Sequence, residues 1–226
     1  MSRGRDILTR RGLRDLVILL SAVSAVFYTP SPAMVSVAFV LLSLGSFIHF
    51  VSKGVLIRNE VLCRDGVYSI VRHPYYLANY LVDSGFCALS GNAYLLLAYP
   101  FLFFWSYGPT LRKEEGMLTE KHPGPSVAFI LGTPPVFPDR LSIGNVGALF
   151  AGFSMRRISI KEAARIVRFY AMAFLILAVG RIAAAGSGRF HPVCEPSTLM
   201  PLLPAVILYA LSLVILAMRK RRLAKA

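Results

Sequence analysis

The stretch AMVSVAFVLLSLGSFIHFV, residues 33–51, decides the class of fold, because none of its 19 residues is Asp, Glu, Lys or Arg. A helix needs roughly 20 apolar residues to cross the hydrocarbon core of a bilayer. Its backbone must be closed by internal hydrogen bonds, since lipid offers no water partners. The whole chain agrees: 56% of its residues are hydrophobic, 16% are charged and its mean hydropathy is +0.61. We therefore predict an all-α integral membrane protein.

Further apolar segments on both sides of this stretch predict a single membrane domain, residues 1–226, with about six transmembrane helices. The short turns YTPSPA and SGNA predict tight antiparallel hairpins joining the first two spans and the next two. The prolines of HPGP and TPPVFP exclude a regular helix over residues 119–145. A short amphipathic helix is expected at 158–166, after a serine cap. The expected spans are residues 14–29, 33–51, 75–91, 93–111, 166–185 and 199–218.

The basic residues alternate between connecting segments, which predicts one orientation in the membrane. Residues 1–14, 52–74, 112–168 and 219–226 hold 23 of the 25 Lys and Arg residues. Because basic loops stay in the cytoplasm, both termini should be cytoplasmic in a multi-pass protein of the cell or inner membrane. This rule also accounts for the net charge of +14, so no nucleic-acid partner is expected.

Cysteine and histidine spacing gives no sign of a metal site. The three cysteines, Cys63, Cys87 and Cys194, contain no CxxC pair and are odd in number, which argues against zinc and against a disulfide framework. His191 and Cys194 form a lone HPVC, which is more typical of a loop. We expect no metal cofactor.

The third expected span carries a polar stripe. Asp83, Tyr80, Asn79 and Tyr76 lie on one helical face, at spacings of three, four and seven residues. An ionisable group inside a span is a functional candidate. Small polar side chains also order helix bundles through interhelical hydrogen bonds. Both interpretations of Asp83 remain open on the sequence.

Two charged motifs lie at the expected cytoplasmic ends of the third and fourth spans. In VRHPYY, residues 71–76, Pro74 suits the first turn of a helix and places Arg72 and His73 at the interface. An alternative is a snorkelling arginine beside interfacial tyrosines. The adjacent Glu114 and Glu115 follow in LRKEEGML, where they could equally be surface residues paired with neighbouring basic side chains.

Together these motifs resemble the isoprenylcysteine carboxyl methyltransferase and phospholipid methyltransferase superfamily of membrane enzymes. The stretch GVYSIVRHPYY matches its RHPxY element at Arg72, His73, Pro74 and Tyr76, and its upstream Gly-x-Tyr at Gly66 and Tyr68. The Glu114–Glu115 pair matches its EE element. The resemblance covers residues 60–138, about a third of the chain.

The resemblance implies that S-adenosylmethionine binds in a cytoplasmic pocket of a core over residues 52–138. Carboxylates suit the ammonium and ribose hydroxyls of this cofactor, and cationic donors suit its carboxylate. The implied catalytic residues are Arg72, His73 and Glu115. The implied cofactor-binding residues are Gly66, Tyr68, Arg72, His73, Pro74, Tyr76, Asn79, Glu114 and Glu115.

The chain departs from the family pattern at three positions. Ala78 stands where glycine is common, and Val127 and Ile130 replace two spaced tyrosines after the EE element. Gly124 and the ending Pro135, Phe137 and Pro138 keep the family register. The departures put the substrate in doubt more than the cofactor.

The expected function is methyl transfer from S-adenosylmethionine to a lipid or lipid-linked acceptor, of isoprenoid or phospholipid type, at the cytoplasmic face. A carboxylate or thiolate acceptor would arrive charged, whereas an amine would need a base such as His73 or Glu115. Two alternatives remain: an NADPH-dependent enzyme resembling sterol reductases, and a non-catalytic membrane scaffold. Residues 158–226, with the last two spans, would be a scaffold, a homo-oligomer surface or a wall of the substrate site.

Overall fold

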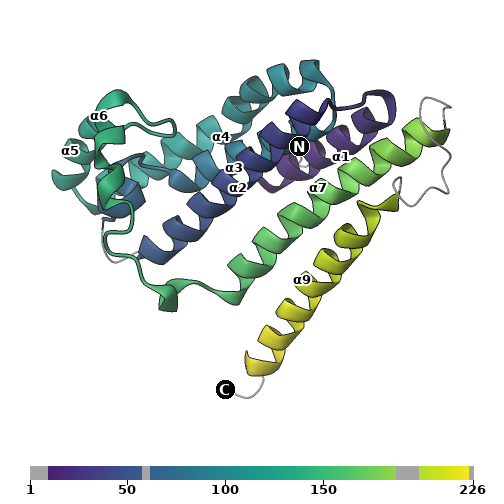
Figure 1. Cartoon of the computed structure of the whole chain (residues 1–226). Coiled ribbons are helices and arrows are strands. Elements are labelled where there is room, and N and C mark those ends of the chain that lie inside the picture. The colour runs from purple at the N-terminus through teal and green to yellow at the C-terminus, as the bar shows by residue number, and fades with distance from the viewer. Residues whose placement is uncertain (1–9, 58–61, 187–198, 224–226) are drawn as a thin grey trace, which may run out of the picture.

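The computed structural model describes residues 10–57, 62–186 and 199–223. All regular structure in these ranges is helical, which confirms the all-α prediction, and six long helices overlie the six expected spans. Figure 1 shows the long helices side by side, with the short ones gathered at one end. The helices are α1 (Arg10–Phe27), α2 (Pro32–Val55), η1 (Gly66–Ser69), α3 (Pro74–Leu89), α4 (Ala93–Lys121), α5 (Pro125–Gly132), α6 (Arg140–Ile143), η2 (Gly144–Ala148), η3 (Met155–Arg157), α7 (Ile160–Gly186) and α9 (Leu202–Leu223).

Two helices begin at side-chain caps that the sequence makes available. The Ser31 hydroxyl accepts a hydrogen bond from the Met34 N–H at 3.2 Å, with Pro32 in the first turn of α2. The Asn92 side-chain oxygen accepts from the N–H groups of Tyr94 and Leu95 at the start of α4. Such caps satisfy N–H groups that have no partner within the helix, so they fix where each helix starts.

Helix α3 is central, because it packs against α1, α2, α4 and α7. Its closest neighbour is α2, which runs antiparallel to it. A Cβ on Gly45 of α2 would lie 2.8 Å from the Ala78 carbonyl oxygen, and one on Gly85 of α3 would lie 3.0 Å from that of Ala38. Small residues at these points let the two backbones approach closely, as is common between membrane helices.

The prediction that the first two spans pack together as a hairpin is wrong. The turn between α1 and α2 is short, but α1 packs chiefly against α7 and α3 rather than along α2. The reason is that α3 occupies the face of α2 that carries Gly45, where the two backbones approach closely. The second hairpin is observed, since α3 and α4 pack together.

Two predictions about the short segments also need correction. Residues 158–166 do not form a separate amphipathic helix, because α7 runs without a break from Ile160 to Gly186. The segment 119–145 does contain a regular helix, α5, which begins with Pro125 at its first turn. A proline at that position loses no hydrogen bond, so the HPGP motif starts a short helix as well as ending α4.

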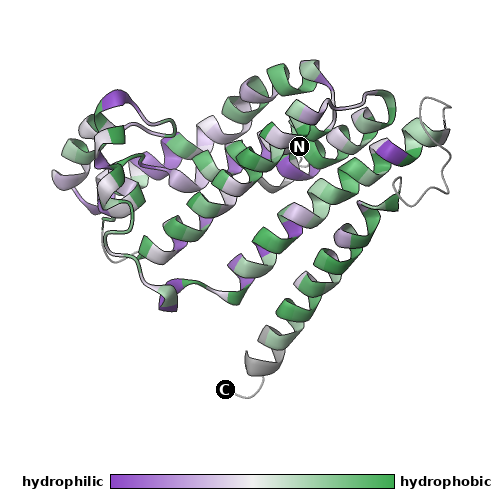
Figure 2. Ribbon diagram, viewed as in Figure 1, coloured by the Kyte–Doolittle hydropathy of each residue, from purple (hydrophilic) through white to green (hydrophobic). Residues whose placement is uncertain are grey.

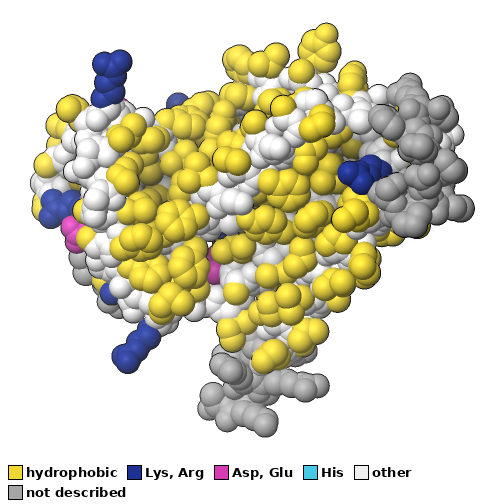
Figure 3. Space-filling view, viewed as in Figure 1, with side chains coloured by type: hydrophobic (Ala, Val, Ile, Leu, Met, Phe, Trp, Pro, Cys, Tyr) yellow, Lys and Arg dark blue, Asp and Glu magenta, His cyan; other side chains and the backbone are white. Residues whose placement is uncertain are grey.

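Two helices, Pro32–Val55 and Ile160–Gly186, are long and apolar enough to cross a membrane, and the apolar part of α9, Leu202–Met218, is shorter. Hydrophobic residues dominate the ribbons of α2, α7 and α9 in Figure 2. Hydrophobic side chains also cover most of the face drawn in Figure 3, with few charges among them. Such continuous apolar surface is unusual on a soluble monomer and marks a surface for lipid or protein contact.

Candidate active site

A cavity of about 1120 Å³ lies between α1, α2, α3, α4 and α7, with Tyr209 of α9 also on its wall. Its volume slightly exceeds the range of about 300–1,000 Å³ that is usual for small-molecule sites. Seven of the nine expected cofactor residues line it: Tyr68, Arg72, His73, Pro74, Tyr76, Asn79 and Glu114. Gly66 and Glu115 are not on its wall.

Backbone bonds hold the RHP segment in place at the start of α3. The N–H groups of Arg72 and His73 donate to the carbonyl oxygens of Pro134 and Pro135, each at 2.9 Å. The next residue, Pro74, begins α3 where its missing N–H costs nothing. The TPPVFP segment thus pairs with the RHP segment and determines where His73 stands.

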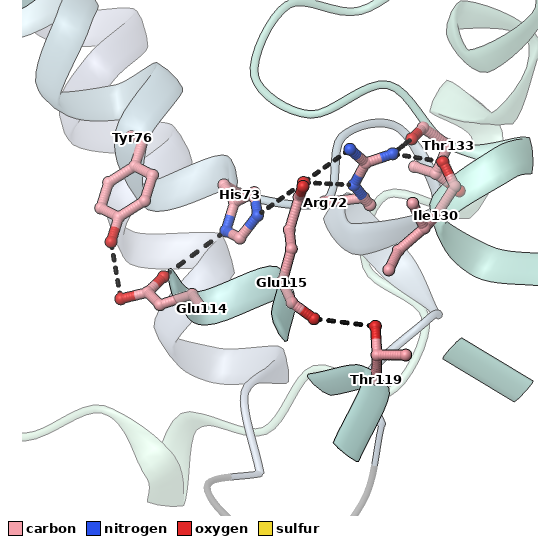
Figure 4. A network of polar contacts seen from close by, with 8 residues as sticks. All are labelled: Arg72, His73, Tyr76, Glu114, Glu115, Thr119, Ile130 and Thr133. Carbon is pink, nitrogen blue, oxygen red and sulfur yellow. Dashed lines mark hydrogen bonds and ion pairs between the residues drawn. The ribbon is translucent and has the colours of Figure 1, made fainter. Parts of the chain in front are cut away.

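Arg72 makes hydrogen bonds to two other segments of the chain. Its Nε and Nη2 donate to Glu115 Oε1 at 3.0 and 2.6 Å, and its Nη1 donates to the carbonyl oxygens of Ile130 and Thr133. Figure 4 shows the guanidinium held between the Glu115 carboxylate and this stretch of backbone. Arg72 therefore joins α3 to α4 and to the end of α5.

His73 stands between the two glutamates. Its Nδ1 lies 3.6 Å from Glu114 Oε2 and its Nε2 lies 3.5 Å from Glu115 Oε1. The ring stacks on Tyr76 with a centroid distance of 5.4 Å. Its Nε2 is buried, and among the described residues its nearest acceptor is this Glu115 oxygen, at the long end of hydrogen-bond distance. Burial lowers the pKa of His73, and the two glutamates offset this only in part.

Of the two glutamates, Glu114 faces the cavity. Its Oε1 accepts a hydrogen bond from the Tyr76 hydroxyl at 2.7 Å. Tyr76 is in turn braced by an edge-on contact with Tyr107, at 5.1 Å between ring centroids. The RHP and EE elements thus lie side by side in space, with Glu114 on the cavity wall and Glu115 bonded to Arg72.

Gly66 has a backbone reason for being glycine. Its φ of +61° lies in the left-handed region, and a Cβ would come within 2.7 Å of the Ala151 carbonyl oxygen. The residue therefore permits close contact between η1 and the segment after η2. It supports the neighbouring wall residue Tyr68 from outside the cavity.

A second polar network crosses the bundle between α1, α2, α3 and α4. Arg14 donates from Nε to Asp83 Oδ1 at 2.8 Å and from Nη2 to Asn79 Oδ1 at 2.7 Å. Tyr99 donates to the other Asp83 oxygen at 3.1 Å. This network includes two members of the predicted stripe, and Asp83 joins three helices. Tyr80 instead contacts aromatic rings, namely those of Tyr99, Phe103 and Phe137.

Sequence reasoning missed several polar residues of the cavity wall, namely Arg14, His49, Glu162, Arg165 and Arg168. Arg14 was counted only as a basic residue flanking a span. Arg165 and Arg168 are three residues apart, which places them on one helical face, so the amphipathic pattern contained a usable signal. Arg165 pairs with Glu162 at 2.7 Å. No pattern singles out His49 within its apolar run.

Within the described ranges, no group of three His, Cys, Asp or Glu side chains has a metal-binding arrangement. Cys63 and Cys87 are free thiols. His191 and Cys194 lie outside the described residues.

Comparisons of the chain with protein-family models, with curated proteins and with solved structures found no match.

Proposed function

We propose that the chain is a multi-pass membrane enzyme that transfers a methyl group from S-adenosylmethionine to a lipid or lipid-linked acceptor. In this proposal six helices span the bilayer, both termini are cytoplasmic and the cavity opens toward the cytoplasmic face. The alternation of basic segments supports this orientation. The apolar outer surface supports a membrane location.

The observation that carries the proposal is the cavity wall formed by His73 and Glu114, two residues that are 41 positions apart in the sequence. The cavity is large enough for a nucleoside cofactor. The Glu114 carboxylate offers an acceptor to an ammonium or to ribose hydroxyls. The His73 ring lies beside Glu114 on this wall, with Nδ1 3.6 Å from Glu114 Oε2, so that the two side chains present a donor and an acceptor side by side. These features fit the proposed cofactor.

The geometry suggests different roles for the expected residues. Glu114, His73 and Tyr76 would contact the cofactor, with Tyr68, Pro74 and Asn79 completing the wall. Arg72 and Glu115 would act as positioning residues, because they bond to each other. S-adenosylmethionine, when bound, supplies a methyl group that is already activated. The protein then has to hold the reacting atoms in line, which can lower a barrier by about 7–11 kcal/mol.

One observation favours an NADPH-dependent reductase as a second candidate. Arg165 and Arg168 of α7 line the same cavity, and a 2′-phosphate is recognised by basic side chains. Glu162 neutralises Arg165 at 2.7 Å, which weakens this case. Competition between NADPH and S-adenosylhomocysteine for the purified protein separates the two candidates.

The scaffold alternative is favoured by the Arg72–Glu115 pair, which would hold the fold without any ligand. Substitution of Glu114 distinguishes the scaffold from the enzyme, since Glu114 faces the cavity and is not part of the Arg72–Glu115 pair. A scaffold would bind no cofactor before or after Glu114→Gln, whereas an enzyme would bind it and lose affinity with this substitution.

The test is to incubate the purified protein, in lipid nanodiscs, with radiolabelled S-adenosylmethionine and a total lipid extract. We expect label in the organic phase with the wild-type chain, and a loss of at least about tenfold with Glu114→Gln. Glu120→Gln is the matched control, since it makes the same change on an exposed part of α4. Absence of label, together with absence of cofactor binding by calorimetry, would remove the proposal.

A further inference from the structure

Arg168 of α7 lines the cavity, and no carboxylate of the described residues forms an ion pair with it. This includes Asp15 and Glu114, which lie on the same wall. Arg168 is therefore the arginine of the wall whose charge the described residues leave without a counter-charge. The other three arginines of the wall each meet a carboxylate, in the pairs Arg14–Asp83 at 2.8 Å, Arg72–Glu115 at 2.6 Å and Arg165–Glu162 at 2.7 Å.

The guanidinium of Arg168 keeps most of its hydrogen-bonding capacity. Its Nε donates to the carbonyl oxygen of Ala164, one turn earlier in α7, at a distance of 3.3 Å. The N–H groups on its Nη atoms meet no acceptor among the described residues. Arg168 is half-buried rather than fully buried, so a ligand in the cavity can reach these donors.

Contacts with two other helices fix which face of α7 is turned to the cavity. The guanidinium carbon of Arg14 lies 4.8 Å from the centre of the Phe169 ring, and the His49 ring lies 5.6 Å from it. Phe169 is buried, so α7 cannot rotate without losing these contacts with α1 and α2. The residues of α7 that line the cavity recur at intervals that place them on one helical face, namely Glu162, Arg165, Arg168, Phe169 and Met172.

This face of α7 changes from charged to apolar along the helix. Glu162, Arg165 and Arg168 come first, and Phe169 and Met172 follow. In the proposed orientation α7 starts at the cytoplasmic interface, so the arginines lie nearer the lipid headgroups and Met172 lies deeper. A ligand along this wall therefore meets cations at one end and apolar side chains at the other. An amphiphile with an anionic headgroup has the matching pattern.

The cavity has room for such a ligand beside the cofactor. Its volume of about 1120 Å³ exceeds the range of about 300–1,000 Å³ that is usual for one small molecule. Arg168 lies outside residues 60–138, which hold the expected cofactor residues. Arg72, the arginine of the RHP element, is already bonded to Glu115 and to backbone carbonyl groups, so it is less free to take an anion.

We propose that Arg168 binds an anionic group, a phosphate or a carboxylate, of the methyl acceptor, whose apolar part lies along Met172. A planar guanidinium suits either group, because it can donate two parallel hydrogen bonds to a pair of oxygens. This inference rests on the proposed function and names the class of its acceptor as an anionic amphiphile.

The first test follows the Nε resonance of Arg168 in protein with ¹⁵N-labelled arginine, in micelles of uncharged dodecyl maltoside. Arg168→Gln identifies this resonance. The probes are dodecyl phosphate and dodecanoate, with dodecanol as the neutral match and inorganic phosphate as an anion without a chain. We expect at least one anionic amphiphile to shift the Arg168 resonance more than dodecanol or inorganic phosphate does. The resonance of Arg156, an exposed arginine just before α7, should respond less.

The pattern of responses distinguishes the two anions. A shift with dodecyl phosphate alone identifies a phosphate headgroup, and a shift with dodecanoate alone identifies a carboxylate. An equal shift of Arg156, an equal response to dodecanol or to inorganic phosphate, or no response at all overturns the proposal. Displacement of the bound amphiphile by NADPH but not by NADH would place a 2′-phosphate on Arg168 and would also overturn it.

The second test measures label transfer from S-adenosylmethionine to lipid extract. Loss of a charged hydrogen-bonding group should raise the amount of extract needed for half-maximal transfer at least about tenfold in Arg168→Gln. Arg168→Lys, which keeps the charge, should restore part of the loss, and Arg156→Gln should match wild type. The S-adenosylmethionine concentration needed for half-maximal transfer should change by less than about twofold. An equal rise for both substrates would place Arg168 at the cofactor and overturn the proposal.

Binding of S-adenosylhomocysteine, measured by calorimetry, separates this inference from the proposed function. We expect Arg168→Gln to bind it as wild type does, which also shows that the variant is folded. If the wild-type chain does not bind it, the proposed function fails, and the resonance of Arg168 still decides whether an anionic amphiphile binds there.

Discussion

Helix α3 is held by two arginine–carboxylate pairs that differ in their surroundings. Near its middle, Asp83 is fully buried and meets Arg14 of α1 at 2.8 Å. Just before its start, Arg72 meets Glu115 of α4 at 2.6 Å, and the Glu115 side chain is 24% exposed. The Asp83 pair joins long helices, whereas the Arg72 pair joins a helix to a loop.

The comparison shows that residues of a motif can position the site by fixing how the surrounding segments pack. The inner pair, Arg14 and Asp83, fixes how α1, α3 and α4 pack. The outer pair, Arg72 and Glu115, fixes the RHP segment against the end of α5, so that His73 and Glu114 face the cavity. Loss of the inner pair should therefore weaken the whole bundle, and loss of the outer pair should loosen one end.

The largest effect is expected for Asp83→Ala. It leaves the half-buried guanidinium of Arg14 with Asn79 but without its charged partner, which should lower the free energy of unfolding by about 3 kcal/mol, measured in mixed detergent micelles. The double substitution Arg14→Met with Asp83→Leu should recover most of this loss, because neither charge remains. A loss below about 1 kcal/mol for Asp83→Ala would show that the inner pair does not hold the bundle.

Arg72→Ala should have a smaller and more local effect. Removing the charged hydrogen bonds to Glu115 and to the α5 carbonyl groups should cost about 2–3 kcal/mol. Hydrogen exchange should accelerate in residues 125–135 but not in α1. Arg72→Lys should rescue little, since a lysine lacks the planar fork. Equal acceleration in both regions would erase the distinction between the two pairs.

Glu115→Gln should affect the stability of the protein rather than its affinity for the ligand. An amide oxygen can still accept from Arg72, so we expect a stability loss of about 1 kcal/mol, as for an ordinary hydrogen bond. The affinity for S-adenosylhomocysteine, measured by calorimetry, should change by less than about threefold. A larger loss of affinity than that of Glu114→Gln would reverse the assigned roles.

The smallest effect concerns pH. Burial lowers the pKa of His73 below its ordinary value of 6.5, so the unfolded chain binds the proton more tightly than the folded chain. The contribution of His73 to stability is therefore present above pH 6.5 and is lost as pH falls toward the lowered pKa. His73→Gln should reduce the pH dependence of unfolding between pH 5 and 7, relative to wild type. An unchanged slope would contradict the buried, neutral state of His73.

Much of the fold could be predicted from sequence because apolar runs and breakers are local signals. The positions of the six long helices follow from such signals. Which helices pack together is not a local property. The contact of Gly45 with the backbone of α3, which leaves α1 to pack on α7, depends on shape across the bundle.

The candidate site divides in the same way. The RHP and EE motifs could be identified because together, at their separation of 41 residues, they resemble the motifs of a methyltransferase superfamily. Arg14 could not, since a basic residue before a span is expected for orientation alone. His49 could not either, because its place on the cavity wall and its bond to Asn79 exist only in the folded bundle.

The central claim is that Glu114, on the cavity wall, holds S-adenosylmethionine. Calorimetric titration of the nanodisc-embedded protein with S-adenosylhomocysteine tests it most directly, with Glu114→Gln compared with Glu120→Gln. We predict that wild type and Glu120→Gln bind alike, and that Glu114→Gln binds at least about tenfold more weakly, since hydrogen bonds to a charged group contribute about 1.5–3 kcal/mol. Equal binding by all three proteins, or binding by none, would contradict the claim.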